Sequence, residues 1–207
     1  MTKISIDGSA HHIDAQAGKK LGEILEDVMT SMSPARVVTE ITVDGKSLRG
    51  LLHQPDCYES NCDSVNDIEI QTVDRAIWAE SGIDMALSSL ERVKTSLVKV
   101  AELFRGGSNI KANDYFVRCV EGLERFIETM MTTRGILELD FTKISHDGLS
   151  LAKMESELCQ ILQSIVHQQE NAEYEAIADQ LEDELAPNLA FWVRALKQLR
   201  LTQSSNA

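Results

Sequence analysis

The residues with the clearest potential for chemistry gather in one polar loop, which holds His53, Cys57 and Cys62. Imidazole and thiolate groups are the ligands that Zn²⁺ prefers in proteins, and His11 or His12 could supply a fourth. Structural zinc sites usually combine two paired ligand motifs, whereas Cys57 and Cys62 form a single C-x4-C. The residue types therefore make these side chains metal candidates, while their spacing favours a surface loop that binds no metal.

The same loop could also hold a cysteine nucleophile, because a thiolate at neutral pH needs a base or a cation beside it. His53 with Cys57 or Cys62 would form such a pair. No oxyanion donors and no third, orienting group accompany the pair in recognisable form. We therefore predict no catalytic residue, and a small metal-dependent or thiol enzyme centred on this loop stays the alternative hypothesis.

An acidic run near the C-terminus is the second group that could bind a metal. Between His167 and Glu184 there is no basic residue, and the acids are Glu170, Glu173, Glu175, Asp179, Glu182, Asp183 and Glu184. Di-iron helical bundles need Glu-x-x-His pairs on two helices, and the predicted helices contain none. The acids come early in the last predicted helix and basic residues end it, which suits the helix dipole. We interpret the run as a solvated face, which could also meet a basic partner.

Motifs for nucleotide binding and for the commonest hydrolases are absent from the sequence. Gly106-Gly107-Ser108 lacks the lysine and the preceding strand of a phosphate-binding loop, and no G-x-G-x-x-G occurs. Neither a G-x-S-x-G turn nor an H-E-x-x-H helix is present. We therefore predict no cofactor.

Charge and composition limit the partners and the compartment. The net charge is −13 at pH 7, so the chain should repel the phosphates of nucleic acid and an anionic membrane surface. No apolar run approaches the roughly 20 residues that cross a bilayer, and the N-terminus lacks the apolar core of a secretory signal. Four cysteines are few for 207 residues. We expect a cytoplasmic protein without a disulfide framework.

The first 74 residues show the pattern of a small sheet with one helix. Alternating apolar residues predict strands near 4–6, 11–14, 37–43, 48–52 and 68–73, and an apolar stripe at helical spacing predicts a helix over 21–29. Asp7-Gly8 and Asp44-Gly45 are dipeptides typical of hairpin turns. The predicted order is therefore two strands, a helix, and then two or three strands.

This order resembles the ubiquitin-like β-grasp fold, and Val65-Asn66-Asp67-Ile68-Glu69-Ile70 looks like the Gly-Asp-x-Ile-x-Ile final strand of small sulfur carriers. Asn66 stands where that family has glycine. The carriers and ubiquitin act through a free C-terminal diglycine, but here the strand continues into Arg75. The resemblance therefore implies a docking module that binds through its sheet face or an edge strand, and it excludes carrier chemistry.

From residue 75 to 203 the apolar spacing is helical. It predicts helices over about 83–104, 112–137 and 151–168, and a fourth apolar segment over 174–199. Pro187 lies inside the fourth segment and predicts a break near Ala186. Because each apolar face needs a neighbour, we predict an antiparallel four-helix bundle, and thus an α+β protein with domains at 1–74 and 75–203.

Two pairs of large side chains in the bundle are candidates for partner contact. Phe191 and Trp192 straddle the last apolar stripe, so we expect one of them to be partly exposed. Met130 and Met131 would form an adaptable patch if exposed, although core packing is the more frequent role of such residues. The preferred hypothesis is a non-enzymatic adaptor or assembly factor with a protein partner, which could also form a homodimer. The bundle is similar in architecture to cytoplasmic chaperones of flagellar and secretion systems, which hold a partner's amphipathic helix in a groove.

Overall fold

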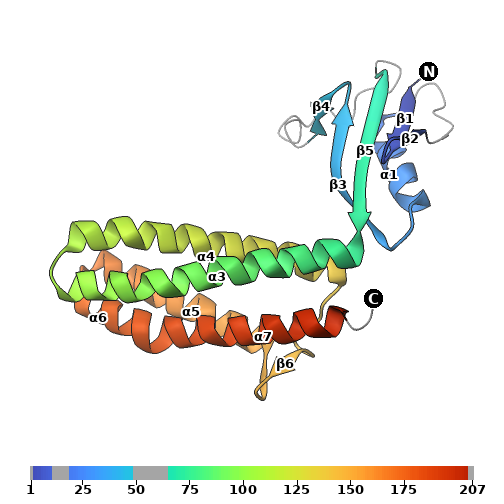
Figure 1. Ribbon diagram of the computed structural model, residues 1–207. Helices are drawn as coiled ribbons and strands as arrows, with labels where there is room; N and C mark the ends of the chain where they lie inside the picture. Colours follow the sequence, from blue (N-terminus) through green and yellow to red (C-terminus); the bar gives the residue numbers. More distant parts are fainter. Residues whose placement is uncertain (1, 11–18, 49–64, 205–207) are drawn as a thin grey trace. The chain divides into compact units, whose positions relative to one another are not determined.

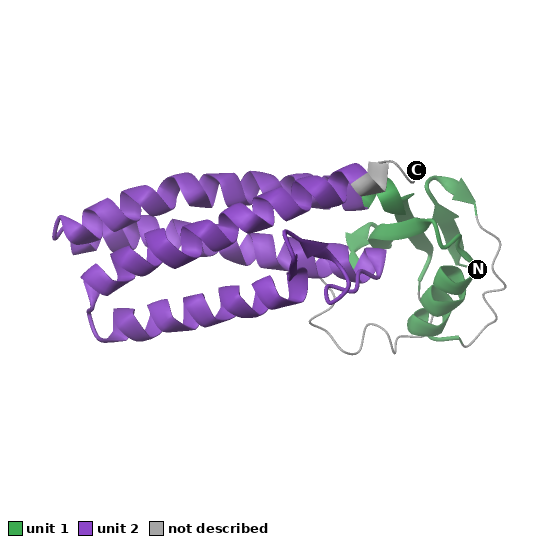
Figure 2. Ribbon diagram, turned by 90° about the horizontal axis from the view of Figure 1, so that it is seen from below, with its two compact units in different colours: residues 1–78 green, residues 79–207 purple. Residues whose placement is uncertain are grey.

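The computed structural model describes residues 2–10, 19–48 and 65–204. The chain divides into two compact units, Met1–Trp78 and Ala79–Ala207, which Figure 2 shows in green and purple. We call them the sheet unit and the helical unit. Helix α3 (Arg75–Arg105) begins directly after the last strand of the sheet unit and continues into the helical unit. Whether the two units fold independently, with a boundary at Asp74, stays a prediction.

The sheet unit contains a mixed sheet of five strands and one helix (Figure 1). The strands are β1 (Lys3–Ile6), β2 (Ser9–Ala10), β3 (Arg36–Val43), β4 (Lys46–Ser47) and β5 (Asp67–Asp74), and the helix is α1 (Leu21–Ser31). The strand order is β2-β1-β5-β3-β4, in which β1 and β5 run parallel and the other neighbours run antiparallel. The predicted strands near 4–6, 37–43 and 68–73 and the predicted helix over 21–29 are therefore confirmed. β2 and β4 lie just before the strands predicted near 11–14 and 48–52, which fall outside the described residues except at Leu48.

Alternation along the strands separates a buried apolar face from an outer face. Ile4, Ile68 and Ile70 are buried in one cluster with the apolar stripe of α1. The opposite face carries Ser5, which is buried, Glu69 and Gln71, which are exposed, and the half-buried pair Val37 and Val73. This face is therefore polar along part of β5 and apolar near its C-terminal end.

The central strand β5 is held at both ends by an aspartate from a hairpin turn. Asp7 Oδ1 accepts the N–H of Thr72 at 2.7 Å, and Asp7 Oδ2 accepts the Thr72 hydroxyl at 2.6 Å. Asp44 Oδ1 accepts the N–H groups of Asn66 and Asp67. Both aspartates have positive φ, which the Asp-Gly turn requires. The turn dipeptides thus fix the hairpins and also anchor the strand between them.

The helical unit consists of five helices packed together. After α3 come α4 (Asn109–Leu137), α5 (Leu151–Glu170), α6 (Tyr174–Gln180) and α7 (Ala186–Ser204), and a π-helical segment, η3 (Leu181–Leu185), joins the last two. A hairpin of β6 (Ser145–His146) and β7 (Leu149–Ser150) precedes α5. The three predicted helices over 83–168 are confirmed, while the hairpin was not predicted. Within the described ranges, no helix is both long enough and apolar enough to cross a membrane.

The predicted boundary near Ala186 is found, since α7 begins there, but it is a change of winding and not a break, because the backbone stays helical through Pro187. Ala186 has φ −62° and ψ −42°, and its N–H donates to Leu181 O, five residues back. A π turn contains more residues than an α turn. This wider turn directly before Pro187 accommodates a ring that would otherwise clash with the carbonyl four residues earlier.

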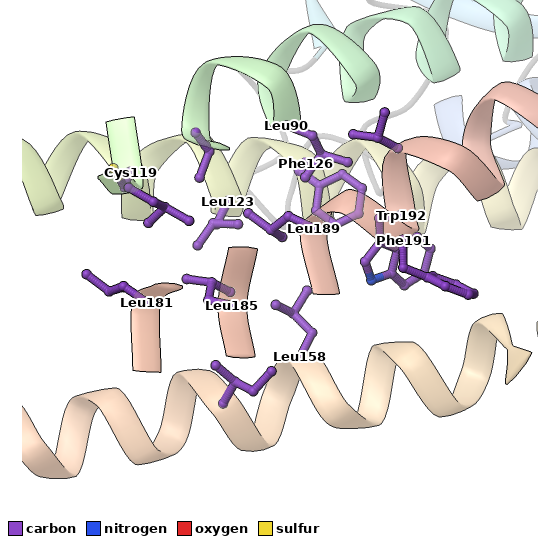
Figure 3. Packing of buried hydrophobic residues seen from close by; sticks show 14 of the residues in the cluster. Leu90, Cys119, Leu123, Phe126, Leu158, Leu181, Leu185, Leu189, Phe191 and Trp192 are labelled. Carbon is purple, nitrogen blue, oxygen red and sulfur yellow. The ribbon is translucent and has the colours of Figure 1, made fainter. Parts of the chain in front are cut away.

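The core of the helical unit follows one face of this last helical segment. Leu181, Leu185 and Leu189 are all fully buried, and Figure 3 shows them between Leu123 of α4 and Leu158 of α5. In a regular α-helix, residues four apart drift around the axis by about 40° per step. The π turn counteracts this drift, so side chains spaced by four stay on one face.

Candidate functional site

The four residues predicted to contact a partner are mostly part of the core. Trp192 is 2% exposed, Phe191 5% and Met130 4%, whereas Met131 is 65% exposed. The expectation that Phe191 or Trp192 is partly exposed is therefore wrong. Only Met131 of the four offers a large exposed surface.

The segment before α5 explains the burial of both aromatic residues. Trp192 packs edge-on against Phe126 with ring centroids 5.4 Å apart (Figure 3). The ring centroid of Phe141 lies 6.1 Å from that of Trp192. His146 of β6 packs edge-on against Phe191 at 5.4 Å. Phe141 and His146 lie in a part of the chain for which the apolar spacing predicted no element, so the covering of α7 by this segment was missed.

The candidate metal and nucleophile residues His53, Cys57 and Cys62 lie outside the described residues, as do His11 and His12. In the described part of the chain, no group of three or more histidine, cysteine or acidic side chains is arranged to hold a metal ion. The two described cysteines are both free thiols. Burial raises the pKa of Cys119 to about 11, so this thiol stays protonated and unreactive at neutral pH.

Part of the acidic run binds the end of α3. Arg105 donates to Asp179 at 2.8 Å and to Glu182 at 2.6 Å, and these bonds raise the pKa of its guanidinium. Asp179 belongs to α6 and Glu182 to η3. One arginine therefore spans the point where the helix changes from α to π winding.

The helical unit has an open groove between α5 on one side and α6, η3 and α7 on the other. Its volume is about 740 Å³. The apolar lining comes from Leu149, Met154, Ile161, Pro187 and Phe191. The polar and charged lining comes from Glu157, Gln160, Ser164, Gln180, Glu184, Asn188 and Arg194. We call this surface the α5–α7 groove.

One wall of the groove is a second stripe of residues spaced by four. Gln180, Glu184 and Asn188 line the groove, each one position before a leucine of the buried stripe. Because the π turn counteracts the drift of residues spaced by four, both stripes stay aligned along this helical segment. The same winding that accommodates Pro187 therefore places two amides and a carboxylate along one side of the groove.

Both amides in this wall carry a buried oxygen without a hydrogen-bond donor among the described residues. Gln180 is 8% exposed and Asn188 is 5% exposed. Their amide nitrogens are bonded, to Glu184 Oε2 at 3.1 Å and to Met154 O at 3.4 Å. A buried acceptor without a partner costs about 1–3 kcal/mol, and such groups are rare in native proteins.

The charges around the groove are mixed, with an acidic excess. Glu157 and Glu184 line it, and Arg194 is the one cation among the described lining residues. Arg194 Nε lies 3.8 Å from Asp147 Oδ2 of the β6–β7 turn, so part of its charge is already balanced. The groove can thus supply apolar contact, two unpaired acceptors and two carboxylates.

Sequence reasoning missed Gln180 and Asn188, although a signal for them was present. Leucines spaced by four on both sides of a proline indicate that one helical stripe continues past the proline, which a wider turn before it allows. Amides placed one residue before each leucine of such a stripe lie beside the core instead of on the opposite, solvated face. The acidic residues beside these amides instead favoured the interpretation of the whole run as a solvated face.

The family model described as "Domain of unknown function (DUF8042)" matches residues 83–195, which is more than half of the chain. The chain belongs to the DUF8042 family. A second family model, "Domain of unknown function (DUF8043)", matches residues 3–73. No curated protein and no solved structure matches the chain. Every residue that lines the groove lies within the DUF8042 match.

Proposed function

We propose that this DUF8042 protein is a non-enzymatic binding protein, an adaptor or chaperone-like factor, which holds an amphipathic helix of a partner protein in the α5–α7 groove. The observation that carries the proposal is the combination of an apolar lining with two buried amide oxygens that no described residue satisfies. Such oxygens favour a groove that is completed by an incoming donor.

The size and lining of the groove suit a helix better than a small metabolite. A volume of about 740 Å³ is within the range of ligand sites, but the groove is open to solvent and lies between α5 on one side and α6, η3 and α7 on the other. Grooves between helices bind amphipathic helices through anchors spaced by three or four residues. Met154, Ile161 and Phe191 would receive the apolar anchors.

For the sheet unit we propose a β-grasp fold that serves as a second docking module. The order of hairpin, helix and second hairpin around a parallel β1–β5 pair supports this fold. The exposed Glu69 and Gln71 on the outer face of the sheet favour recognition through hydrogen bonds and charges.

Site-specific photo-crosslinking tests the binding role of the groove. Gln160 and Gln163 are both exposed on α5, but only Gln160 lines the groove. A photoreactive amino acid would replace each in turn, in cells that contain the protein naturally. We expect the variant at position 160 to crosslink to one defined protein, through a segment with an amphipathic helical pattern.

The variant at position 163 is the matched control, since it differs in position and not in chemistry. Equal crosslinking from both positions would contradict the proposal. A variant at position 160 that crosslinks to no protein, or only to a second copy of this chain, would also contradict the proposal, because the proposed occupant is a different protein.

A further inference from the structure

The orientation of the two groove amides is fixed by what their nitrogens contact. Gln180 Nε2 donates to the carboxylate of Glu184, and Asn188 Nδ2 donates to the carbonyl of Met154. Turning either amide over would set its oxygen against another oxygen, with no proton between them. The atoms left without a partner are therefore acceptors, and only a donor can satisfy them.

The carboxylates that line the groove indicate which kind of hydrogen-bond donor would fit there. Glu184 shares the wall with both amides, and Glu157 lies on the α5 side of the same groove. Glu157 already lies 3.9 Å from Lys153 Nζ, so Glu184 is the lining carboxylate that a neutral donor would leave without a counter-charge. Lysine offers three N–H donors and arginine five, and both carry the positive charge that this carboxylate favours.

We propose that the helix bound in the α5–α7 groove carries two lysine or arginine residues within its apolar face, one whose N–H groups bond to Gln180 Oε1 beside Glu184 and one whose N–H groups bond to Asn188 Oδ1. Both oxygens are buried in this structure, so binding requires each amide side chain to turn toward the groove. This inference rests on the proposed function and adds the chemistry of the partner. The long alkyl stem of either residue would pack on the apolar lining while its charged end reaches one of the amides.

A peptide selection tests this chemistry without knowledge of the natural partner. The probe is a display library of amphipathic helical peptides in which each apolar-face position varies among Leu, Met, Gln, Glu, Lys and Arg. The full chain is the target. We expect the selected peptides to share two Lys or Arg residues flanked by apolar residues at helical spacing.

Amide variants then test where the basic residues bind. Gln180→Met and Asn188→Leu remove the acceptors and keep a similar volume, and Gln163→Met makes the same kind of change on the exposed face of α5. We expect the first two to weaken binding of the selected peptides about tenfold to hundredfold, and the third to leave it unchanged. Circular dichroism of each variant checks that the helices are intact.

The possible failures separate the inference from the function that it extends. Selected peptides that crosslink to α5 and α7 but lack basic residues in the apolar face, or that bind the amide variants as tightly as the original chain, would overturn the inference alone. A selection that yields no peptide, or peptides whose crosslinks map outside the groove, would overturn the proposed function and the inference with it.

Discussion

The two units differ in how they satisfy their buried polar groups. In the sheet unit, the turn aspartates Asp7 and Asp44 accept the backbone N–H groups at both ends of β5. Among the described residues, eight buried polar side-chain atoms lack a hydrogen-bond partner, and all of them except Asp67 Oδ1 belong to the helical unit. Within the ranges that the structure describes, buried polar groups are therefore mostly hydrogen-bonded in the sheet unit, whereas several in the helical unit lack a hydrogen-bond partner.

This difference indicates where to look for binding. A fold tolerates unpaired buried acceptors when function requires them, at a cost of about 1–3 kcal/mol each. Gln180 and Asn188 are two such residues, and both line the groove. The comparison predicts that substitutions in the core destabilise the helical unit, whereas substitutions of the groove amides do not.

The largest expected effect concerns the core around Trp192. Replacing Trp192 with alanine should lower the free energy of unfolding by about 3–5 kcal/mol, because the indole ring packs against Phe126 and Phe141. Urea denaturation followed by far-ultraviolet circular dichroism measures this loss.

Met131→Ala is the control, since Met131 is 65% exposed, and it should change the free energy by no more than about 0.5 kcal/mol. A loss below about 1 kcal/mol for Trp192→Ala, roughly a third of the smallest expected value, would show that Trp192 is not a core residue.

The second effect tests how closely α3 and α4 approach each other. A Cβ atom on Gly122 would lie 2.5 Å from Cγ2 of Val93, whose branched side chain cannot turn away freely. Gly122→Ala should therefore destabilise the helical unit by about 1 kcal/mol, because overpacking outweighs the gain in helix propensity.

Gly135 lies in the same helix with no atom near the position of a Cβ. Gly135→Ala should stabilise the unit by roughly 0.5–1 kcal/mol. The same substitution would then have opposite signs at two positions of one helix. Thermal unfolding of both variants checks this, and a gain in stability for Gly122→Ala would contradict the close helix contact.

A third and smaller effect tests the sheet unit by pH. Hydrogen bonds from Thr72, with the charge of Arg36, hold the pKa of Asp7 below its usual value. A carboxyl group with a lowered pKa stabilises the folded state above its usual pKa of about 3.9, and this contribution is lost as the pH falls through the folded value. Acidification below about pH 4 should therefore weaken the sheet unit.

Asp7→Asn should remove part of this pH dependence and lower stability near neutral pH, because an amide nitrogen cannot accept the bonds made to Oδ2. Asp44→Asn is the matched change in the other turn, where one oxygen accepts both N–H groups and an amide oxygen can replace it. Urea midpoints at about pH 7 and pH 3 compare the two. Equal losses would show that the second oxygen of Asp7 contributes nothing.

The sequence allowed the elements of both units to be predicted, because their order follows from local periodicity. The alternation around Ile68 and Ile70 and the apolar stripe from Ile83 to Phe104 are each visible within one element. The β6–β7 hairpin was missed although Asp147-Gly148 repeats the other two turn dipeptides, because its strands have two residues each and show no alternation.

The groove could not be predicted in the same way, because it depends on contacts between distant segments. The burial of Phe191 requires His146, and the alignment of Gln180 with Asn188 requires the π turn before Pro187. Glu184 is exposed, as the interpretation of the acidic run as a solvated face predicts, and the periodicity gave no sign that it also lines the groove. The candidates His53, Cys57 and Cys62 stay predictions, since they lie outside the described residues.

The most direct test of the account is urea unfolding of the Gln180→Met, Asn188→Leu double variant, with and without a peptide selected on the original chain. Without peptide, we expect the variant to be about as stable as the original, because the removal of two unpaired acceptors offsets the loss of the bonds from Gln180 Nε2 and Asn188 Nδ2. With peptide, the original should gain stability and the variant should gain much less. A variant that is clearly less stable without peptide, or that gains as much with it, would contradict the claim that these amides are kept for binding.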